Sequence, residues 1–423
     1  MDSQVSGLPH RSLAQTRTRV TLERSLGSLL AQFGYEQLDT PSIEPVSVPE
    51  TEQYHRLMLA RGDARRPLAL RSDLTISLVS AISSSLPRVT LPKRLVQVGS
   101  VWRGERPQRG RYRQARRFDV DIVSWEPKVF YDAEVLYLAY RCLDLAFAEL
   151  GPPVFRLSHS GIPREILVSL GYACETGIHK DSLRLLRRSR SKERGELMQA
   201  LVNLGMSLDS AREFSALLEI GSTYECRSFL KTHGASVRCL EVLEAVARAA
   251  ESFGVPESSL RFDFSMSGTG YYDGIVFEEA MELASRPLLE GGKYSAHRNE
   301  KQLMSGVGFS MDLDALVEMT TSPDSGDYGL ILCAKSEDEA LDMLADASRI
   351  RNSGISVSIA VSEDDDRVGQ RRSESERMKR AFASFEPDGT VVLRDALSGE
   401  AEVFESLVEA GDAIRGWGEA DHA

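Results

Sequence analysis

Hydrophobic and polar residues follow two different spacings along the chain, and each spacing predicts one kind of element. Apolar residues at near-helical intervals predict amphipathic helices over 12–33, 76–86 and 131–150. Gly34 closes the first of these helices, because glycine readily adopts the left-handed conformation that ends a helix. Short apolar runs between polar turns predict strands, with signals at 68–70, 94–102, 117–125, 262–266, 271–279 and 306–319.

The composition changes along the chain in a way that predicts its division into domains. Segments rich in Leu, Ala, Glu and Arg predict a helical insert over about 151–260, within a first domain of 1–320. The small and polar residues that follow predict a linker at 321–327. Beyond it, alternating strand and helix signals predict a small α/β tail domain over 328–423.

Within this tail domain, apolar runs at 328–333 and 355–361 predict strands. The run TVVLRDALSGEAEVFE predicts two more strands around a Ser-Gly turn. Ser336 and Glu339 have the spacing of a capping box and predict the start of a helix. The charged stretch at 363–380 predicts a loop that leads into another helix.

The composition also excludes several classes of protein. Of 423 residues, 42% are hydrophobic and 27% are charged, which is ordinary for a globular chain and excludes a disordered or fibrous one. The 51 Lys and Arg residues against 63 Asp and Glu give a net charge of −12, so no chain-wide basic field exists to hold nucleic acid. No apolar stretch approaches the ~20 residues of a membrane span, and the N-terminus lacks the apolar core of a signal peptide. We therefore expect a cytoplasmic protein without a membrane segment.

The spacing of cysteine and histidine argues against a metal centre. The cysteines are widely spaced, form no CxxC pair and are predicted to be reduced core residues: Cys142, Cys174, Cys226, Cys239 and Cys333. The histidines show no zinc-like spacing either. We expect neither a metal ion nor a cofactor.

The densest chemistry lies in a predicted hairpin, in which two strand-like runs flank a Pro-Gln-Arg-Gly turn. Seven arginines fall within its fifteen central residues: Arg103, Arg106, Arg109, Arg111, Arg113, Arg116 and Arg117. Strand alternation would turn Arg103 and Glu105 to one side of the hairpin, and likewise Arg111 and Arg113 on the returning strand. Planar guanidinium groups can each offer two parallel donors to a polyphosphate or a carboxylate. A solvated basic turn and a nucleic-acid patch are the alternatives, and the acidic chain disfavours the second.

Six ordered segments of the chain resemble histidyl-tRNA synthetases, and they are equally similar to the regulatory subunit of ATP phosphoribosyltransferase, a paralogue of that family. The segments are FGYEQLDTPSIEP (33–45), LRSDLT (70–75), WRGERPQRGRYRQARRFDVDI (102–122), GYYDGIVFE (270–278), LLEGGKY (288–294) and GVGFSMDLDAL (306–316). The resemblance covers roughly residues 5–320. The helical insert corresponds only in character and position, and the tail resembles a reduced anticodon-binding domain.

The resemblance implies an α+β fold, with a class II synthetase-like antiparallel sheet flanked by helices, and a dimer formed around residues 10–45. In an active synthetase, Arg103 would hold the α-phosphate of ATP, Glu105 would contact the adenine amino group, and Arg111 would serve the nucleotide phosphates. Other matching positions line the amino-acid pocket. The remnant ligand pocket predicted from the resemblance comprises Asp73, Arg103, Glu105, Arg111, Arg113, Arg117, Asp121, Tyr271 and Tyr272. A purely structural hydrogen-bond network is the alternative for these residues.

Two catalytic arginines of the synthetase pattern are missing. Ala315 stands where the Gly-Leu-Glu-Arg element carries its arginine, and Ser267 stands where the Arg-Gly-Leu-Asp-Tyr-Tyr run begins. Losing one such cation typically costs ~3 kcal/mol of transition-state stabilisation, or 10²–10³-fold in rate. Arg117 also replaces a glutamine that contacts the substrate histidine, and a cation there repels a substrate ammonium. Lys293, followed by Tyr294 and Ser295, begins the segment that is Arg-Tyr-Asp in the family.

These departures predict a retained fold with abandoned chemistry and no catalytic residues. The first hypothesis is a regulatory subunit that a short ATP phosphoribosyltransferase requires for activity and for histidine feedback, in the first step of histidine biosynthesis. Its expected partners are that catalytic subunit, a second copy of this chain, and histidine or a related small molecule. The second hypothesis is a divergent enzyme that activates an amino acid with ATP. An authentic histidyl-tRNA synthetase and a non-catalytic tRNA-binding protein are further alternatives, and tRNA is not an expected partner.

Overall fold

The chain consists of two compact units, Met1–Thr320 and Thr321–Ala423. The computed structural model describes residues 5–8, 10–45, 67–84, 90–104, 112–147, 151–174, 176–189, 193–267, 272–280, 287–299, 302–319, 329–352, 355–361, 380–385, 390–395, 400–407, 409–411 and 413–414. The predicted linker at 321–327 lies outside these residues. All positions of the predicted ligand pocket belong to the first unit.

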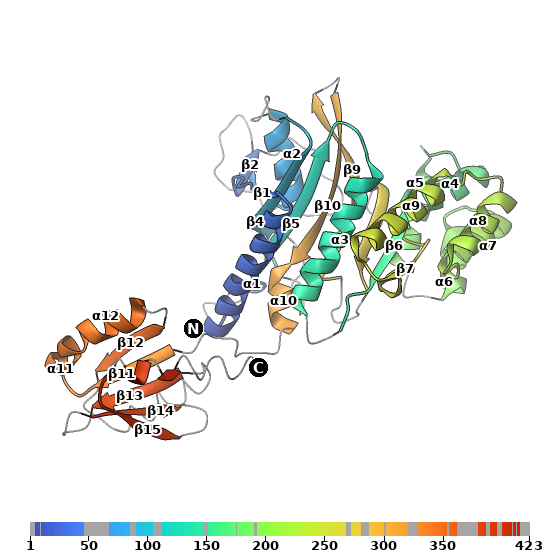
Figure 1. Ribbon diagram of the computed structural model, residues 1–423. Helices are drawn as coiled ribbons and strands as arrows, with labels where there is room; N and C mark the ends of the chain where they lie inside the picture. The colour runs from blue at the N-terminus through green and yellow to red at the C-terminus, as the bar shows by residue number, and fades with distance from the viewer. Residues whose placement is uncertain are drawn as a thin grey trace. The chain divides into compact units, whose positions relative to one another are not determined.

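Eight described strands form the central sheet of the first unit, in the order β1-β4-β5-β10-β9-β8-β6-β7 (Figure 1). They are β1 (Glu36–Gln37), β4 (Lys93–Trp102), β5 (Gln114–Ser124), β6 (Phe155–His159), β7 (Leu260–Phe262), β8 (Tyr272–Glu279), β9 (Leu289–Asn299) and β10 (Gln302–Asp312). Neighbours are antiparallel except at the two edges, where β1 with β4 and β6 with β7 are parallel. A separate pair joins β2 (Ile43–Pro45) to β3 (Leu68–Leu70). The expected antiparallel sheet flanked by helices is confirmed.

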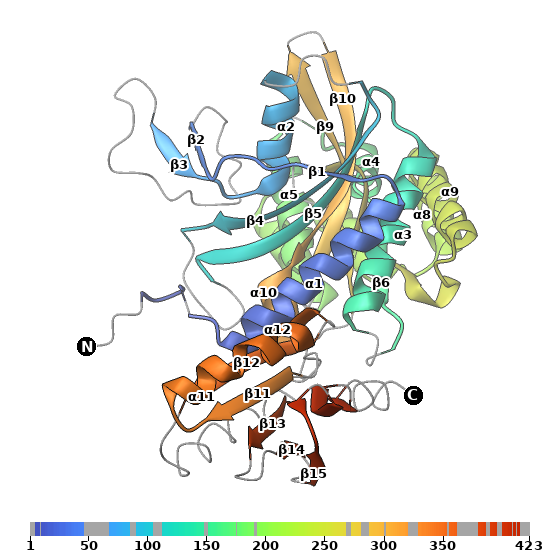
Figure 2. The same cartoon turned by 60° about the vertical axis from the view of Figure 1, so that its left-hand side comes forward.

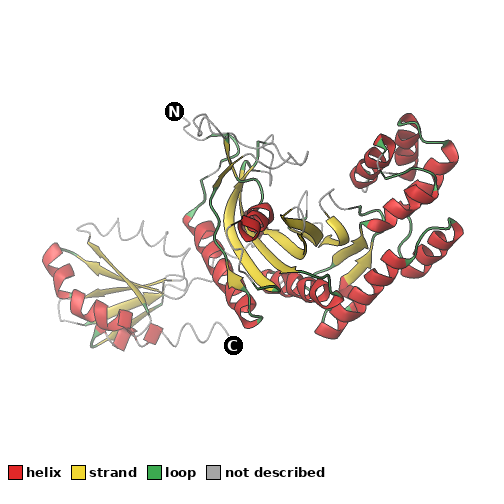
Figure 3. Cartoon of the chain, turned by 90° about the horizontal axis from the view of Figure 1, so that it is seen from above, coloured by secondary structure: helices red, strands yellow, loops and turns green. Residues whose placement is uncertain are grey.

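The sheet has two faces of opposite character. Its flanking helices are α1 (Leu13–Gln32), α2 (Leu74–Ser84) and α3 (Val129–Ala146). Phe118, Val120 and Ile122 of β5 belong to the main core together with residues of α1 and α3, and we call this side the back face. The alternate residues Asp119 and Asp121 lie on the other side, the front face, which α2 covers. Figure 3 shows α1 and α3 on one side of the curved sheet and α2 on the other.

The helical insert lies between β6 and β7 in the chain. Its described helices are α4 (Gly161–Ser169), α5 (Gly177–Arg188), α6 (Arg194–Asn203), α7 (Leu208–Ser215), α8 (Thr223–Thr232) and α9 (Arg238–Phe253), with 3₁₀ turns at Ala216–Leu218 and Glu257–Ser259. Thr176, Ser207 and Ser222 each accept a backbone N–H at the start of a helix, so local side chains set these boundaries. The longest of these helices, α9, packs against α3 (Figure 1).

The second unit is a small α/β domain with a five-stranded sheet in the order β12-β11-β13-β14-β15. Its elements are β11 (Gly329–Ala334), α11 (Glu337–Asp342), α12 (Leu344–Asn352), β12 (Ser356–Val361), β13 (Arg380–Phe385), β14 (Val391–Asp395) and β15 (Ala401–Phe404). The three strands β12, β11 and β13 are parallel, whereas β14 and β15 continue the sheet antiparallel. As predicted, Ser336 accepts the N–H of Glu339 and begins α11.

Several predicted boundaries are wrong for physical reasons. The strand signal at 262–266 ends at Phe262, because Asp263 turns the chain by accepting the N–H of Ser265. The signal at 306–319 divides at Asp312, whose carboxylate accepts the N–H of Ala315 at 3.1 Å and caps α10 (Leu313–Met319). Figure 2 shows α10 beside α1.

Two further expectations need correction. The charged stretch at 363–380 ends in strand β13 rather than in a helix, since the parallel partner β11 pairs with it, and residues 362–379 lie outside the described residues. Of the five cysteines, Cys142 and Cys226 are buried, but Cys174 is exposed and is not a core residue. Among the described residues, no helix combines the length and the apolar character that a membrane crossing requires.

Candidate ligand site on the front face of the sheet

Three carboxylates lie together on the front face. Strand alternation places Asp119 and Asp121 of β5 on this side, where their exposed fractions are 2% and 1%. Asp73 comes from the start of α2, where its Oδ1 accepts the N–H of Ile76 at 3.2 Å. The charge of Asp73 acts on both β5 carboxyls and raises their pKa. The topology therefore brings Asp73 close to two acids that follow it by 46 and 48 positions in the chain.

Hydroxyl groups donate to both β5 carboxylates. Tyr294 of β9 donates its hydroxyl to Asp121 Oδ1 at 2.8 Å. Asp119 accepts from the hydroxyls of Ser310, at 2.5 Å, and Thr75, at 3.5 Å. Asp121 Oδ2 is buried, and no described residue donates a hydrogen bond to it. An acceptor of this kind is costly unless a ligand or water pairs with it.

Burial controls the ionisation of these acids. Burial raises the pKa of Asp119 to about 7, and the charge of Asp73 adds to the shift. The hydrogen bond from Ser310 and the positive charges of Arg117 and Arg103 oppose it. Burial also raises the pKa of Asp121 well above its usual range, with Asp119 adding to the shift and Tyr294 opposing it. Near neutral pH, the cluster can therefore hold protons that a cationic ligand would release.

Two glycines of β10 make room for this arrangement. A Cβ at Gly308 would lie 2.2 Å from Asp121 Oδ1, and a Cβ at Gly306 would lie 2.2 Å from Cζ of Tyr294. Any larger residue would displace the carboxylate or the phenol ring. The GVGFS segment therefore fits the front face because its glycines alternate with the back-face residues Val307 and Phe309.

Two guanidinium groups lie beside the acids. Arg103, which directly follows β4, is 9% exposed, and its Nε donates to the carbonyl of Ser72 at 3.2 Å. Arg117 of β5 is 5% exposed, and its Nη2 lies 3.7 Å from Asp312 Oδ2. We call the polar residues gathered on this face the front-face cluster. Its members are Asp73, Thr75, Arg103, Arg117, Asp119, Asp121, Tyr294, Ser310 and Asp312. Arginine and carboxylate thus alternate across one buried surface.

The position of the first missing arginine is closed by the helical insert. Ser267 is 4% exposed, and its hydroxyl donates to the carbonyl of Leu183 in α5 at 3.2 Å. A serine fits between the segment after β7 and this helix. The hydroxyl supplies a dipole directed at a backbone carbonyl, and it carries no positive charge.

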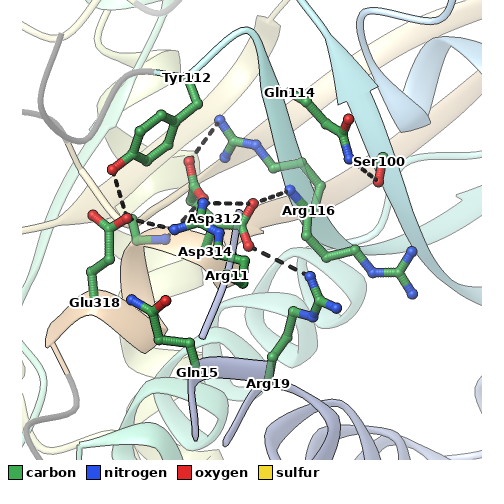
Figure 4. Close-up of polar contacts among 12 residues, drawn as sticks. Arg11, Gln15, Arg19, Ser100, Tyr112, Gln114, Arg116, Asp312, Asp314 and Glu318 are labelled. Carbon is green, nitrogen blue, oxygen red and sulfur yellow. Dashed lines mark hydrogen bonds and ion pairs between the residues drawn. The ribbon is translucent and has the colours of Figure 1, made fainter. Parts of the chain in front are cut away.

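The position of the second missing arginine, Ala315, is 7% exposed and packs in the main core. Neighbouring residues of α10 attract arginines from the N-terminal part of the chain (Figure 4). Arg11 lies 3.3 Å from Asp314 and 2.7 Å from Glu318, and Arg19 lies 3.8 Å from Asp314. These guanidinium groups are held by carboxylates of α10, so they neutralise that helix rather than add net positive charge beside position 315.

The structure brings together four residues of the predicted pocket, Asp73, Arg103, Arg117 and Asp121. Tyr272 lies on β8 opposite Tyr294, and its carbonyl accepts from Arg164 at 3.2 Å. Arg113 is the exception among the described positions, because its guanidinium donates to the carbonyl of Ser6 at 3.4 Å, in the N-terminal segment. The remaining predicted positions lie outside the described residues: Glu105, Arg111 and Tyr271.

Sequence reasoning missed Asp119 and the contact of Arg117 with Asp312. The alternation in FDVDI contained a signal for Asp119, since it shares a face with Asp121. No local signal linked Arg117 to Asp312, which are 195 positions apart. Within the described residues, no group of three or more His, Cys, Asp or Glu side chains is placed to hold a metal ion.

Comparison with known proteins gives one consistent result. Residues 7–316 match the family model described as histidyl-tRNA synthetase. Histidine–tRNA ligase of Helicobacter hepaticus is 28% identical over 333 residues, which cover 74% of each chain. That of Wolinella succinogenes is 27% identical over 435 residues, covering 97% of this chain and 92% of the relative.

Solved structures show the same fold. The crystal structure of histidyl-tRNA synthetase from Nostoc sp. PCC 7120 superposes with a TM-score of 0.82 at 18% identity, covering 99% of both chains. A structure from Bacillus halodurans C, named ATP phosphoribosyltransferase regulatory subunit/histidyl-tRNA synthetase, gives 0.71 at 20% identity, covering 91% of this chain and 98% of that one. The sheet and its helices therefore have the class II synthetase-like architecture.

Proposed function

The chain belongs to the histidyl-tRNA synthetase family, and from this premise we propose that it is a non-catalytic regulatory subunit of a short ATP phosphoribosyltransferase. The observation that carries the proposal is the loss of both catalytic arginines, at Ser267 and Ala315, from an otherwise retained scaffold. The proposed role is to make the short transferase active and sensitive to histidine, at the first step of histidine biosynthesis in the cytoplasm.

The energetics support a non-catalytic role. Amino-acid activation develops negative charge on the reacting carboxylate and the phosphates, and fixed cations lower that barrier. Each lost arginine costs about 10²–10³-fold, so two independent losses amount to about 10⁴–10⁶-fold. The cations near position 315 are engaged by Asp312, Asp314 and Glu318, and Ser267 directs its hydroxyl at Leu183. We infer that adenylate formation is too slow to be the function.

The choice of partner has two supports. The Bacillus halodurans structure of the same fold carries the name of the regulatory subunit as well as that of the synthetase. A retained scaffold without catalysis still offers surfaces for self-association and for a catalytic chain.

Feedback through such a complex is a coupling free energy between two sites, typically about 1–3 kcal/mol. The front-face cluster is proposed to be the remnant of the amino-acid site of the family.

Reconstitution with a short catalytic chain tests the proposal. The full chain and the transferase are mixed, separated by size exclusion, and assayed for ATP phosphoribosyltransferase activity with and without histidine. We expect a stable complex, stimulation of the transferase, and histidine inhibition only when this chain is present. The transferase alone is the control, and failure of the two chains to associate contradicts the proposal.

A divergent amino-acid-activating enzyme is the second candidate, because Arg103 keeps its buried place beside Asp119. Pyrophosphate exchange with ATP and each amino acid in turn separates the two candidates, with an authentic histidyl-tRNA synthetase as the positive control. The regulatory proposal predicts no exchange above background for any amino acid. Robust exchange with a single amino acid establishes the enzyme instead.

A further inference from the structure

The two units of the chain differ in net charge, and the second unit carries all of it. Residues 1–320 contain 40 Lys and Arg against 40 Asp and Glu, so the first unit is neutral overall. Residues 321–423 contain 11 basic residues against 23 acidic ones, which accounts for the entire net charge of −12. A small domain with this charge repels the phosphates of RNA and attracts cationic surfaces.

The helices α11 and α12 of this unit expose apolar side chains away from their sheet (Figure 2). Met343 and Ala347 belong to the core of the unit. Leu341 and Leu344, by contrast, are 58% and 45% exposed, and helical spacing places the exposed Ala345 beside Leu341. Exposed apolar side chains that are grouped on one helix face, rather than scattered singly, are typical of a surface that binds a partner.

Acidic residues lie beside this apolar group. Glu337 and Asp338 precede Leu341 by four and three positions, which places them on the same side of α11. Asp342 is also exposed, and none of these three acids forms an ion pair with a described cation. From 335 to 349 the chain has five acidic residues and two basic ones, so the local charge is negative as well. We call this surface the acidic-apolar face, and its members are Glu337, Asp338, Leu341, Asp342, Leu344 and Ala345.

We propose that the acidic-apolar face docks a protein partner whose contact surface is a cationic, amphipathic helix. Apolar side chains of the partner cover Leu341 and Leu344, and its Lys or Arg side chains lie against the acids at the rim. Burial of the leucines supplies affinity, whereas the charges select the partner and speed its association. RNA does not fit this face, because its phosphates would meet the same acids. The inference concerns the second unit alone and goes beyond the proposed function, since it does not depend on what the first unit does.

Three matched peptides test the chemistry of the partner. The first is a short fluorescent peptide of leucine and lysine, spaced to form an amphipathic helix, and its binding to the full chain is measured by anisotropy at low and at physiological salt. We expect saturable binding that salt weakens. Replacing the leucines of the peptide by serine, or its lysines by glutamate, should each weaken binding by about tenfold or more.

Paired variants of the full chain locate the binding surface. Leu341→Ser/Leu344→Ser and Glu337→Gln/Asp338→Gln should each weaken binding of the leucine–lysine peptide by about tenfold or more. Both pairs change exposed residues, and either pair carries the test if circular dichroism shows that the other has unfolded. The matched control is Val403→Ser/Glu402→Gln, which removes an exposed apolar and an acidic side chain from β15, the far edge of the same sheet. The control should bind the peptide like the wild type.

Four results would overturn the proposal. The first is the absence of saturable peptide binding, and the second is equal weakening in the control, which would indicate general attraction to an acidic chain. The third is binding of a single-stranded RNA oligonucleotide that the Leu341→Ser/Leu344→Ser variant weakens. The fourth is loss of self-association in that variant by sedimentation velocity, which would make a second copy of this chain the occupant. Reconstitution with the transferase tests the proposed function separately.

Discussion

The two faces of the central sheet both bury carboxylates, but they satisfy them differently. On the back face, Glu134 of α3 receives both donors of Arg94 at 2.7 Å, and Asp132 lies 3.1 Å from the ammonium group of Lys293. On the front face, Asp119 and Asp121 receive hydroxyl donors. The described back-face acids therefore face cations directly, whereas Asp119 and Asp121 bond to hydroxyl groups on a surface that also carries Arg103 and Arg117.

The ionisation of these acids follows the same division. Burial raises the pKa of Asp132 to about 6, and Lys293 opposes the shift. Asp119 reaches about 7, and there the nearby charge of Asp73 adds to the effect of burial. A group of buried acids that raise one another's pKa is typical of ligand sites. The front face is therefore the candidate ligand surface of the sheet, whereas the charge pairs of the back face stabilise the fold.

The largest expected effect comes from breaking a back-face pair. Arg94→Met leaves Glu134, whose side chain is 4% exposed, without its cation, and we expect a loss of about 3–5 kcal/mol in the free energy of unfolding. Urea denaturation measures it. The matched control is Arg184→Met, which breaks an exposed pair with Asp181 and should cost about 1 kcal/mol or less. Equal losses in the two variants would contradict the structural role of the back-face pair.

The second largest expected effect is a gain in stability on replacing Asp119, where the back-face variant loses stability. Its carboxyl has a pKa of about 7 in the folded state and near 4 in the unfolded chain, so the folded state retains the proton longer. Its contribution to stability is complete below about pH 4 and is lost as the pH rises toward 7, on the order of 4 kcal/mol by linkage. Asp119→Asn should therefore be more stable than the wild type at pH 8, by about 2 kcal/mol or more, with a flatter profile between pH 5 and 8.

Thermal and urea unfolding at pH 5 and pH 8 provide the measurement for Asp119→Asn. Asp346→Asn is a suitable control, because this aspartate forms an exposed pair in the second unit. The control should show the wild-type pH profile. A variant at 119 that is less stable than the wild type at pH 8 would show that ionised Asp119 is well compensated, and would remove the contrast between the faces.

The smallest effect tests the space that glycine provides on the front face. Gly308→Ala brings a methyl group against Asp121 and the carbonyl of Val120, and we expect a loss of about 1–3 kcal/mol from overpacking. Gly27→Ala in α1 is the control, because among the described residues no atom outside its chain neighbours and the backbone of its own helix lies within 4 Å of the added carbon. It should stabilise the helix by about 0.5–1 kcal/mol. Chemical denaturation measures the free energy of unfolding, which should fall in Gly308→Ala and rise in Gly27→Ala. An unchanged stability of Gly308→Ala would mean that Asp121 moves aside without cost.

Local signals were sufficient for the elements whose boundaries are set by nearby residues. The helix expected over 12–33 is α1, because Ser12 caps it and the chain turns at Gly34. The predicted hairpin strands correspond to β4 and β5, whose alternation is visible in the chain itself. The prediction of a helix after the charged stretch at 363–380 was wrong, because a distant partner sets the secondary structure there. β13 is a strand because β11 pairs with it.

The candidate site shows the same limit at the level of single residues. Motif resemblance identified Asp73, Arg103 and Asp121, which lie near one another on the front face. It treated Arg117 as a lone cation directed at a ligand, because its counter-charge, Asp312, belongs to a strand nearly two hundred positions later. It also left out Asp119, whose pKa responds to the charges of Asp73, Arg117 and Arg103.

The amino-acid sequence by itself determined the alternation of β4 and β5, the boundary of α1, and the absence of arginine at positions 267 and 315, since these depend on residue type and on neighbours a few positions away. Only the tertiary structure decided which charges meet. Pairing β5 with β10 placed Arg117 against Asp312, and packing α2 on the front face brought Asp73 to Asp119 and Asp121. Burial and Coulomb interactions depend on distance in space, and for residues this far apart in the chain only the fold sets that distance.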